Sequence, residues 1–338
     1  MKASVIVPTH NRPDGLAETL DYLRRQSVAS DCFEIIVVDD GSLPPVTLAE
    51  SVRGPRCRLV RLNGLERSAA RNRGADIAKG EVLIFVDDDT VVRPDFVASH
   101  LCAHAEWPCA LVVGANRLSD AALATPFGQF RQKLERRSLP ERRGPTDRPN
   151  FCTAQNMSIN RDVFRKLGGF APDIISGEDQ DLALRHTSRG GRIVFLPEAM
   201  TIHHDTALDV RSYCRRAEWG AQYLIAFCRR HPDWPDNVER ERVNGPARLG
   251  REPLNQTLRK SIKRAVASNA ILVALFAAAA LFERAAPGSR ALDRVYRLLL
   301  GAHILRGYRK GLKRFGPVRG TGESLDDATP GIVALGDE

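Results

Sequence analysis

EVLIFVDDD, residues 81–89, is an apolar run that ends in three consecutive carboxylates, Asp87, Asp88 and Asp89. Short β-branched runs of this kind are typical of strands buried on both faces of a sheet. Adjacent carboxylates repel one another at low dielectric unless a cation or several donors offset their charge. Oxygen ligands favour Mg2+ or Mn2+, which often complete their coordination with nucleotide phosphates. The stretch therefore predicts a divalent-cation site, and the alternative is an acidic turn in which Asp89 caps the next helix.

Strand and helix patterns alternate on either side of this stretch. The expected strands are 4–8, 34–42, 58–62 and 82–86, with helices over 14–26 and 66–78. This βαβαβ order builds an α/β fold with a mostly parallel sheet, helices on both faces and ligands beyond the carboxyl ends of the strands. Neither G-x-G-x-x-G nor G-x-x-x-x-G-K-[ST] follows the first strand, which argues against dinucleotide oxidoreductases and P-loop phosphotransferases.

The middle of the chain is less regular. Residues 116–150 are rich in Arg and Pro, which predicts a loop or mobile segment, either a solvated stretch or a lid that meets the acceptor. A strand over 153–159 and a helix near 161–167 follow, before the break at Gly168 and Gly169.

Charge and cysteine content indicate which partners and which cellular compartment the protein suits. The 338 residues carry a net charge of +9, and residues 251–315 hold 14 Lys or Arg against 3 acids. A basic segment of this kind suits an anionic surface. The seven cysteines form no C-x-x-C pair, and a strand pattern begins at residue 4, which together predict a reducing cytoplasm and no secretory segment.

Five segments in order resemble the inverting glycosyltransferases of family two. They are VIVPTHNR (5–12), EIIVVDDGS (34–42), SAARNRGADIAKGEVLIFVDDDT (68–90), GGFAPDIISGEDQDLALR (168–185) and LPEAMTIHHD (196–205). The resemblance covers roughly residues 3–206. It implies a GT-A fold, that is, a Rossmann-like mixed and mostly parallel sheet flanked by helices, here with a C-terminal helical extension.

The resemblance also implies roles for particular residues. Nucleotide contacts would come from the ends of the first strands, from the ARNRG run and from the aspartate triplet: Pro8, Thr9, Asn11, Asp40, Arg71, Asp87 and Asp88. Thr9 and Asn11 would line the base and ribose pocket, and Asp87 and Asp88 would lie near the ribose. Asp89 would hold Mn2+ or Mg2+ together with His203 or His204. His203 is favoured by its distance from Pro197, since adjacent strand residues point to opposite faces.

The resemblance assigns the chemistry to Asp179, as the general base that takes the proton of the acceptor hydroxyl. Like charge from Glu178 and Asp181 would raise its pKa and improve it as a base. The alternative is that these acids only favour the positive end of a helix dipole.

The expected reaction is transfer of a sugar from a nucleoside diphosphate sugar, with UDP favoured, to a glycan or lipid-linked hydroxyl with inversion. Processive relatives carry Q-x-x-R-W, whereas this chain has CRRAEWG at 214–220, which favours a single addition. A sugar-phosphate nucleotidyltransferase would need a glycine-rich, Arg-bearing loop after the first strand. A nucleic-acid-binding protein would rest on the basic segment alone, so no nucleic acid partner is expected.

The predicted domains are a catalytic domain, a basic helical extension and a disordered acidic tail: 1–206 (nucleotide half 1–115, acceptor half 116–206), 207–315 and 316–338. Residues 265–282 carry no charge. That run is interpreted as an interfacial helix on an anionic leaflet, with a packed hairpin or a true span as alternatives. The protein is expected in the cytoplasm, peripheral on the inner face of the plasma membrane.

Overall fold

The computed structural model describes residues 1–48, 56–64, 66–204, 209–247, 250 and 252–319. The chain forms two compact units, Met1–Asp209 (unit 1) and Val210–Glu338 (unit 2). The boundary thus falls after Asp209, close to the expected boundary after residue 206. Most of the predicted acidic tail, residues 320–338, lies outside the described residues.

Unit 1 is built on one sheet whose strands follow the order β3-β2-β1-β4-β8-β6-β9-β5, with β7 paired to β9. The strands are β1 (Ala3–Thr9), β2 (Phe33–Asp40), β3 (Cys57–Leu62), β4 (Val82–Val86), β5 (Thr90–Val92), β6 (Leu111–Leu118), β7 (Gly144–Thr146), β8 (Asn156–Asn160) and β9 (Ile193–His203). Strands β1 to β4, β6 and β9 share one direction, and β5, β7 and β8 run against them. The predicted mixed and mostly parallel sheet is confirmed.

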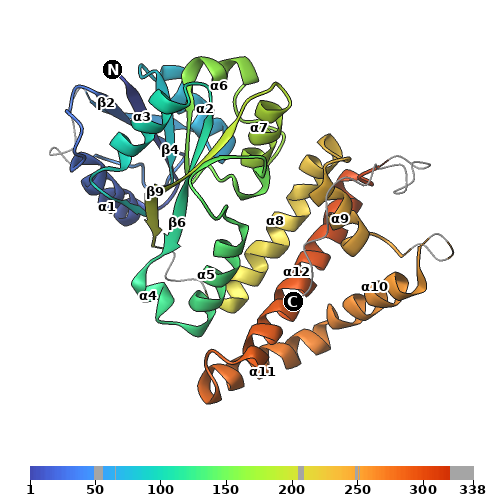
Figure 1. Cartoon of the computed structure of the whole chain (residues 1–338). Helices are drawn as coiled ribbons and strands as arrows, with labels where there is room; N and C mark the ends of the chain where they lie inside the picture. The colour runs from blue at the N-terminus through green and yellow to red at the C-terminus, as the bar shows by residue number, and fades with distance from the viewer. Residues whose placement is uncertain (49–55, 65, 205–208, 248–249, 251, 320–338) are drawn as a thin grey trace. The chain divides into compact units, whose positions relative to one another are not determined.

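Helices cover both faces of this sheet (Figure 1). They are α1 (Pro13–Arg24), α2 (Arg67–Ile77), α3 (Phe96–Glu106), α4 (Asp120–Leu123), α5 (Pro126–Ser138), the 3-10 helix η1 (Pro149–Phe151), α6 (Arg161–Leu167) and α7 (Glu178–Thr187). Side chains of α1 and α3 join the hydrophobic core on one face. Those of α2, α6 and α7 join the core on the other.

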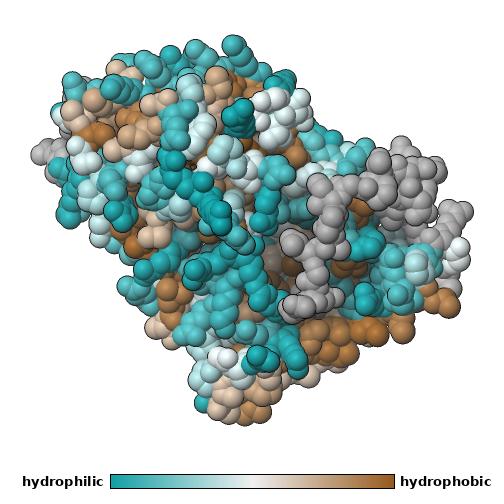
Figure 2. Space-filling view, in the orientation of Figure 1, coloured by the Kyte–Doolittle hydropathy of each residue, from teal (hydrophilic) through white to brown (hydrophobic). Residues whose placement is uncertain are grey.

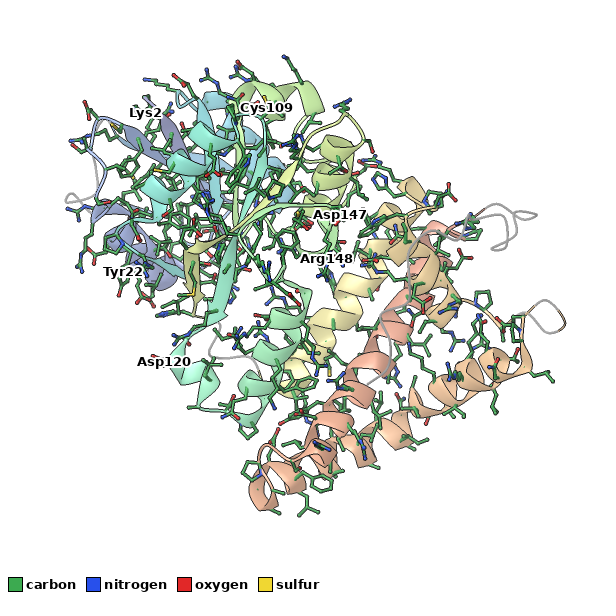
Figure 3. All side chains as sticks on the ribbon, in the orientation of Figure 1. Lys2, Tyr22, Cys109, Asp120, Asp147 and Arg148 are labelled. Atoms are coloured by element: carbon green, nitrogen blue, oxygen red, sulfur yellow. The ribbon has the colours of Figure 1, made fainter. Side chains whose placement is uncertain are left out.

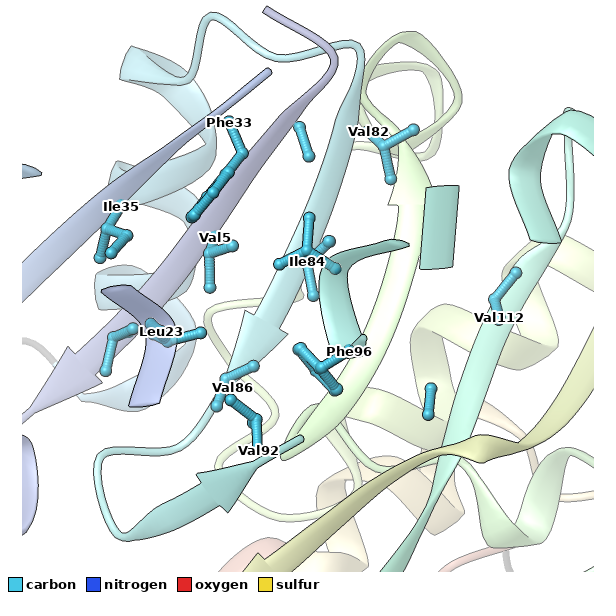
Figure 4. Packing of buried hydrophobic residues seen from close by; sticks show 14 of the residues in the cluster. Val5, Leu23, Phe33, Ile35, Val82, Ile84, Val86, Val92, Phe96 and Val112 are labelled. Carbon is cyan, nitrogen blue, oxygen red and sulfur yellow. The ribbon is translucent and has the colours of Figure 1, made fainter. Parts of the chain in front are cut away.

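The sequence pattern explains this packing. Every residue of β1, β2 and β4 is buried, as expected for strands covered on both faces. Helix α1 turns Leu16, Leu20 and Leu23 inward at helical spacing. Leu23 lies near Val5 and Ile35 in the packed cluster of Figure 4.

The expectation of a loop or mobile segment over 116–150 is wrong for most of that stretch. Helices α4 and α5, strand β7 and η1 occupy it, and Figure 3 labels Asp120, Asp147 and Arg148 there. Thr125 caps α5 by accepting a hydrogen bond from the amide of Gly128, and Pro126 stands at the first helical position, where its missing N–H costs nothing. Arg136 and Arg137 misled the prediction, because they are exposed at the end of a helix that buries Phe127 and Phe130.

Unit 2 is helical. Its elements are α8 (Val210–Arg230), α9 (Pro235–Asn244), α10 (Leu254–Val266), α11 (Asn269–Ala285) and α12 (Arg290–Phe315). The uncharged run 265–282 is not one helix, because α10 ends at Val266 and α11 begins at Asn269. Within the described residues no single helix combines the length and the apolar composition needed to cross a bilayer; the pair α10 and α11 meets those criteria only together, with a bend of 74°.

The crossing of α8 and α12 depends on glycine. A Cβ at Gly307 would lie 2.0 Å from the carbonyl oxygen of Glu218, whereas a Cβ at Gly301 of the same helix would meet nothing closer than 3.9 Å. We expect Gly307→Ala to lower the free energy of unfolding by about 1–3 kcal/mol through overpacking. Gly301→Ala should raise it by up to about 1 kcal/mol, because alanine is the better helix former. Denaturant unfolding of both variants checks this, and equal stability of the two would contradict the close crossing.

Candidate active site

The aspartate triplet lies where β4 gives way to β5. Strand β5 pairs antiparallel with β9, and this register places Thr90 opposite His203. The amide of His204 also donates to the main-chain oxygen of Asp89, at 2.9 Å. Sheet register thus brings the histidine pair from the end of β9 to the aspartates.

Asp87, Asp89 and His203 form a cluster suited to a metal ion. Their ligand atoms all lie within 4.8 Å of one another. Nε2 of His203 lies 2.9 Å from Oδ1 of Asp89, while Nδ1 of His204 lies 3.2 Å from a carboxylate oxygen of Glu18. The structure therefore brings the imidazole of His203, and not that of His204, to the aspartate carboxylates. It also brings Asp87 into this cluster, although the resemblance implied only a position near the ribose.

The cluster has the chemistry of a divalent-cation site. Oδ1 of Asp89 is buried and faces Nε2 of His203. Neighbouring ligands on an octahedron with bonds of about 2.1 Å stand about 3 Å apart, which is close to the separation of Asp89 and His203. Two carboxylates and one imidazole suit Mn2+ or Mg2+. The residues present thus fit the expected metal.

Arg12 contributes positive charge beside the cluster. Its NH1 pairs with Oδ2 of Asp89 and lies 3.5 Å from Oδ1 of Asp88. Burial alone would raise the pKa of Asp89, but His203 and Arg12 outweigh it and hold that pKa below its usual value. At Asp88 burial prevails over the hydrogen bond from Thr9 and raises the pKa to about 6. Two neighbouring carboxyls therefore differ in their readiness to ionise.

The ends of β1 and β2 form a connected rim. The hydroxyl of Thr9 donates to Asp88 at 2.6 Å. Asn11 has a φ of 54°, a left-handed conformation that Asn tolerates, and its side-chain oxygen accepts from the amide of Leu43 at 2.8 Å. The main-chain oxygen of Asp40 accepts from Nδ1 of His10 at 2.8 Å. Pro8, Thr9, Asn11 and Asp40 thus gather at the expected edge of the sheet; their contacts with a nucleotide stay a prediction.

Arg71 connects this rim to α7. Its two amino groups lie 3.0 Å from Asp87 and 3.1 Å from Glu178, and its guanidinium carbon stands 5.7 Å from the ring centre of Phe170. The side chain is only 3% exposed. Arg71 was expected to reach the nucleotide. In the structure its NH1 and NH2 pair with carboxylates of the protein, so a nucleotide contact remains a prediction.

Asp179 follows Glu178 at the start of α7 and is partly exposed. Its carboxylate accepts hydrogen bonds from the amides of Gln180 at 2.8 Å and Ala154 at 3.3 Å. Although part of the residue is exposed, its carboxylate is enclosed by protein, and this burial first, and then the charge of Glu178, raise the pKa of Asp179 to about 7 against the opposing effect of Arg71. The expected direction is therefore present. Asp181 is not among its causes, since that carboxylate pairs with Arg185 at 2.7 Å.

Three site residues escaped the sequence reasoning. Arg12 stood in the quoted VIVPTHNR segment but received no role. Glu178 was treated only as a source of like charge, although it also receives Arg71. Asp39 anchors the loop after β2 by accepting from the amides of Ser42 and Val46, at 2.9 and 3.1 Å. The available signal for Arg12 was a cation directly after the polar strand end.

Comparison with known proteins agrees with this geometry. The sequence model of Glycosyl transferase family 2 matches residues 4–168. This region, which contains the aspartate triplet and Arg71, is similar to glycosyltransferase family 2. Asp179 and His203 lie beyond the matched residues.

Relatives and one solved structure extend the likeness. The chain is 31% identical over 227 residues to the O-antigen biosynthesis protein RfbC of Myxococcus xanthus, covering 61% of this chain and 17% of that protein. It is 26% identical over 236 residues to a pre-mycofactocin glycosyltransferase of Mycobacterium tuberculosis, with coverages of 68% and 48%. The chain thus spans about half or less of these relatives. The mannosyltransferase PcManGT from Pyrobaculum calidifontis, solved with GDP-Man and Mn2+, aligns over 93% of this chain and 88% of its own with a TM-score of 0.57 and 20% identity. That likeness confirms the GT-A fold.

The histidine pair gives a matched test of the cluster. His203→Ala should weaken Mn2+ binding by at least about tenfold, because it removes a ligand. His204→Ala removes an imidazole that faces Glu18 and should leave the affinity within about twofold. Titration of free Mn2+ by electron paramagnetic resonance measures both. Equal effects of the two substitutions, or a larger effect at His204, would show that the metal lies elsewhere.

Proposed function

We propose that this protein transfers a glycosyl group from a nucleoside diphosphate sugar to an acceptor hydroxyl, with inversion and with help from a divalent cation. The observation that supports this most strongly is the Arg71 bridge. One guanidinium group contacts both Asp87, of the metal-suited cluster, and Glu178, the neighbour of Asp179. A metal-bound diphosphate and a proton acceptor would therefore share one site.

The chemical step uses Asp179 as base. Its carboxylate accepts the proton of the acceptor hydroxyl while that oxygen forms a bond to the anomeric carbon. The bond from this carbon to the β-phosphate oxygen breaks, and its electron pair leaves with the nucleoside diphosphate. Attack from the face opposite the leaving group inverts the configuration. A pKa near 7 suits a base that must accept a proton at neutral pH.

Asp87, Asp89 and His203 would hold Mn2+ or Mg2+. When bound, the ion supplies Lewis-acid stabilisation of the charge on the departing diphosphate. Arg12 is about half exposed and stands beside Asp89, so its guanidinium would be accessible to phosphate oxygens of a bound diphosphate. The chain thus offers a flexible cation for the same anion.

The donor is expected to carry UDP, with Asp40 accepting from the pyrimidine ring. GDP is the alternative, because PcManGT, which shares the fold, was solved with GDP-Man. The acceptor is expected to be a glycan or a lipid-linked hydroxyl, in line with the name of the O-antigen relative.

A single addition per encounter is part of the proposal. Glu218, which stands in CRRAEWG where processive relatives have arginine, receives His303 at 2.6 Å and Lys310 at 2.5 Å. This position therefore binds α12 within unit 2. Neither alternative class gains support: the loop after β1 lacks the glycines of a nucleotidyltransferase, and the family match favours an enzyme over a nucleic-acid-binding protein.

Asp179→Asn tests the base. The substitution should lower kcat by about a hundredfold to ten-thousandfold while the Kd for the donor stays within about threefold, because the amide cannot accept the proton. In the parent, kcat/KM should fall about tenfold per pH unit below pH 7, following the ionised fraction of Asp179. Asp162→Asn, at an exposed acid on α6, serves as control. An Asp179→Asn enzyme that turns over like the parent would exclude this base.

Stability gives the same residue an independent readout. The folded-state pKa of about 7 exceeds the ordinary value of 3.8, so the folded chain binds the extra proton and loses stability as pH rises between these values. Above pH 7, the free energy of unfolding of Asp179→Asn should therefore exceed that of the parent by about 1–3 kcal/mol, as measured by denaturant unfolding. If Asp179 were needed only for structure, its substitution would instead lower both stability and activity.

The donor class is tested by turnover. The purified protein should release nucleotide from one member of a panel of UDP-, GDP- and dTDP-sugars with Mn2+ present, and a chelator should abolish the release. Full activity in chelator would contradict the metal requirement. Absence of release from every member, with and without a crude glycolipid acceptor, would contradict the proposed function.

A further inference from the structure

Helix α10 turns its apolar side chains outward. Leu254, Leu258 and Ile262 follow one another at four-residue spacing, and they are 80%, 60% and 55% exposed. A helix at a water surface normally shows the opposite arrangement, with leucines toward the protein and charges toward solvent. The outer face of α10 is therefore unsuited to water.

The two lysines of α10 point the other way. Lys260 is 5% exposed, where its ammonium group pairs with Glu252 at 2.5 Å and donates to the carbonyl of Pro246 at 3.1 Å. Lys263 donates to the side chain of Asn244 at 2.6 Å. Both lysines belong to the basic segment 251–315 that was expected to suit an anionic surface, whereas in the structure they secure the inner side of the helix.

Helix α11 also exposes large apolar side chains. Ile271, Val273 and Leu281 are 39%, 67% and 65% exposed. We call the six exposed side chains of the two helices the α10–α11 face: Leu254, Leu258, Ile262, Ile271, Val273 and Leu281. Figure 2 shows apolar side chains gathered along the lower right edge, over these helices.

The bend between the helices is held by a specific contact. Nε of Arg306 donates to the carbonyl of Ala267 at 2.8 Å, and NH2 donates to the side chain of Asn269 at 2.5 Å. These bonds use the groups left open where α10 ends and α11 begins, with the axes at 74°. The pinned bend favours two helices lying along a surface over one straight span.

The charges around the face are positive. Arginines along α10, α11 and the start of α12 are exposed: Arg259, Arg284, Arg290, Arg294 and Arg297. The acids nearby are engaged, since Glu252 pairs with Lys260 and Glu283 accepts from the hydroxyl of Tyr296 at 2.6 Å. Arg306 also borders a cavity of about 280 Å³ lined by further cations, Arg309, Lys310 and Lys313, together with Glu218.

We propose that the α10–α11 face docks onto an anionic phospholipid bilayer, with both helices lying in the interface. Apolar side chains would enter the acyl boundary while the arginines meet phosphate headgroups. The arginines favour lipid over a second copy of the chain, whose own arginines would repel them. This surface belongs to unit 2 and does not rest on the proposed catalytic function.

Vesicle flotation of the full-length protein tests the proposal. Binding should be strong to phosphatidylcholine mixed with phosphatidylglycerol and weak to phosphatidylcholine alone, and salt should reduce it. Leu258→Ser with Ile262→Ser should lower the partition coefficient at least about tenfold. Val243→Ser, at an apolar residue of α9 that is 39% exposed, is the matched control.

The charge requirement has its own pair of variants. Arg284→Gln with Arg294→Gln should remove most of the preference for phosphatidylglycerol, whereas Arg165→Gln with Lys166→Gln, exposed cations on α6 of unit 1, should leave it intact. Circular dichroism should show unchanged folding. Failure to bind anionic vesicles at low salt would overturn the proposal. The proposal would also be overturned if the protein formed a dimer that the serine variants dissociate. Membrane-bound protein that alkaline carbonate fails to extract would overturn it as well, because that behaviour indicates a spanning helix.

Discussion

A buried arginine holds the two halves of the site together. Arg71 lies between Asp87, just after β4, and Glu178, at the start of α7, and these groups stand far apart in the sequence. Removing one partner of a buried ion pair leaves an uncompensated charge, which typically costs about 3–5 kcal/mol. The positions of the aspartate cluster and of α7 are therefore coupled through one guanidinium group. The position of Asp179 depends on that coupling, because this residue follows Glu178 directly in the chain.

The same arrangement separates the carboxyls by their affinity for protons. Cationic neighbours hold the pKa of Asp89 down, which keeps a negative ligand available for a metal ion. Burial and the charge of Glu178 raise the pKa of Asp179, which suits a proton acceptor. Environments that separate the pKa values of neighbouring titratable groups are a usual basis for assigning acids and bases. Here the division of roles follows from which carboxyl lies beside Arg12 and His203 and which lies beside Glu178.

Much of this could be predicted from the sequence, for physical reasons. Continuous apolar runs allowed strands β1, β2 and β4 to be predicted, and the polar residues that follow them indicated the sheet edge at which the site lies. The preference for His203 over His204 agrees with the geometry, because alternation along β9 lets only one imidazole face Asp89. The bridge through Arg71 could not be predicted, since it depends on the approach of distant elements. Helix α5 was not predicted, because the high arginine content of the segment hid the pattern of its buried aromatic residues. The inward direction of the α10 lysines was not predicted either, because charge alone does not show which way a side chain points.

The central claim is that one site holds a metal-bound diphosphate and, across the sugar, a carboxylate base. Anomalous X-ray scattering from crystals grown with Mn2+ and an unreactive donor analogue measures this directly. The account predicts a manganese peak between Asp89 and His203, in contact with the diphosphate, and the Asp179 carboxylate on the opposite side of the anomeric carbon. A peak bound to other residues, or an anomeric carbon turned away from Asp179, would contradict it.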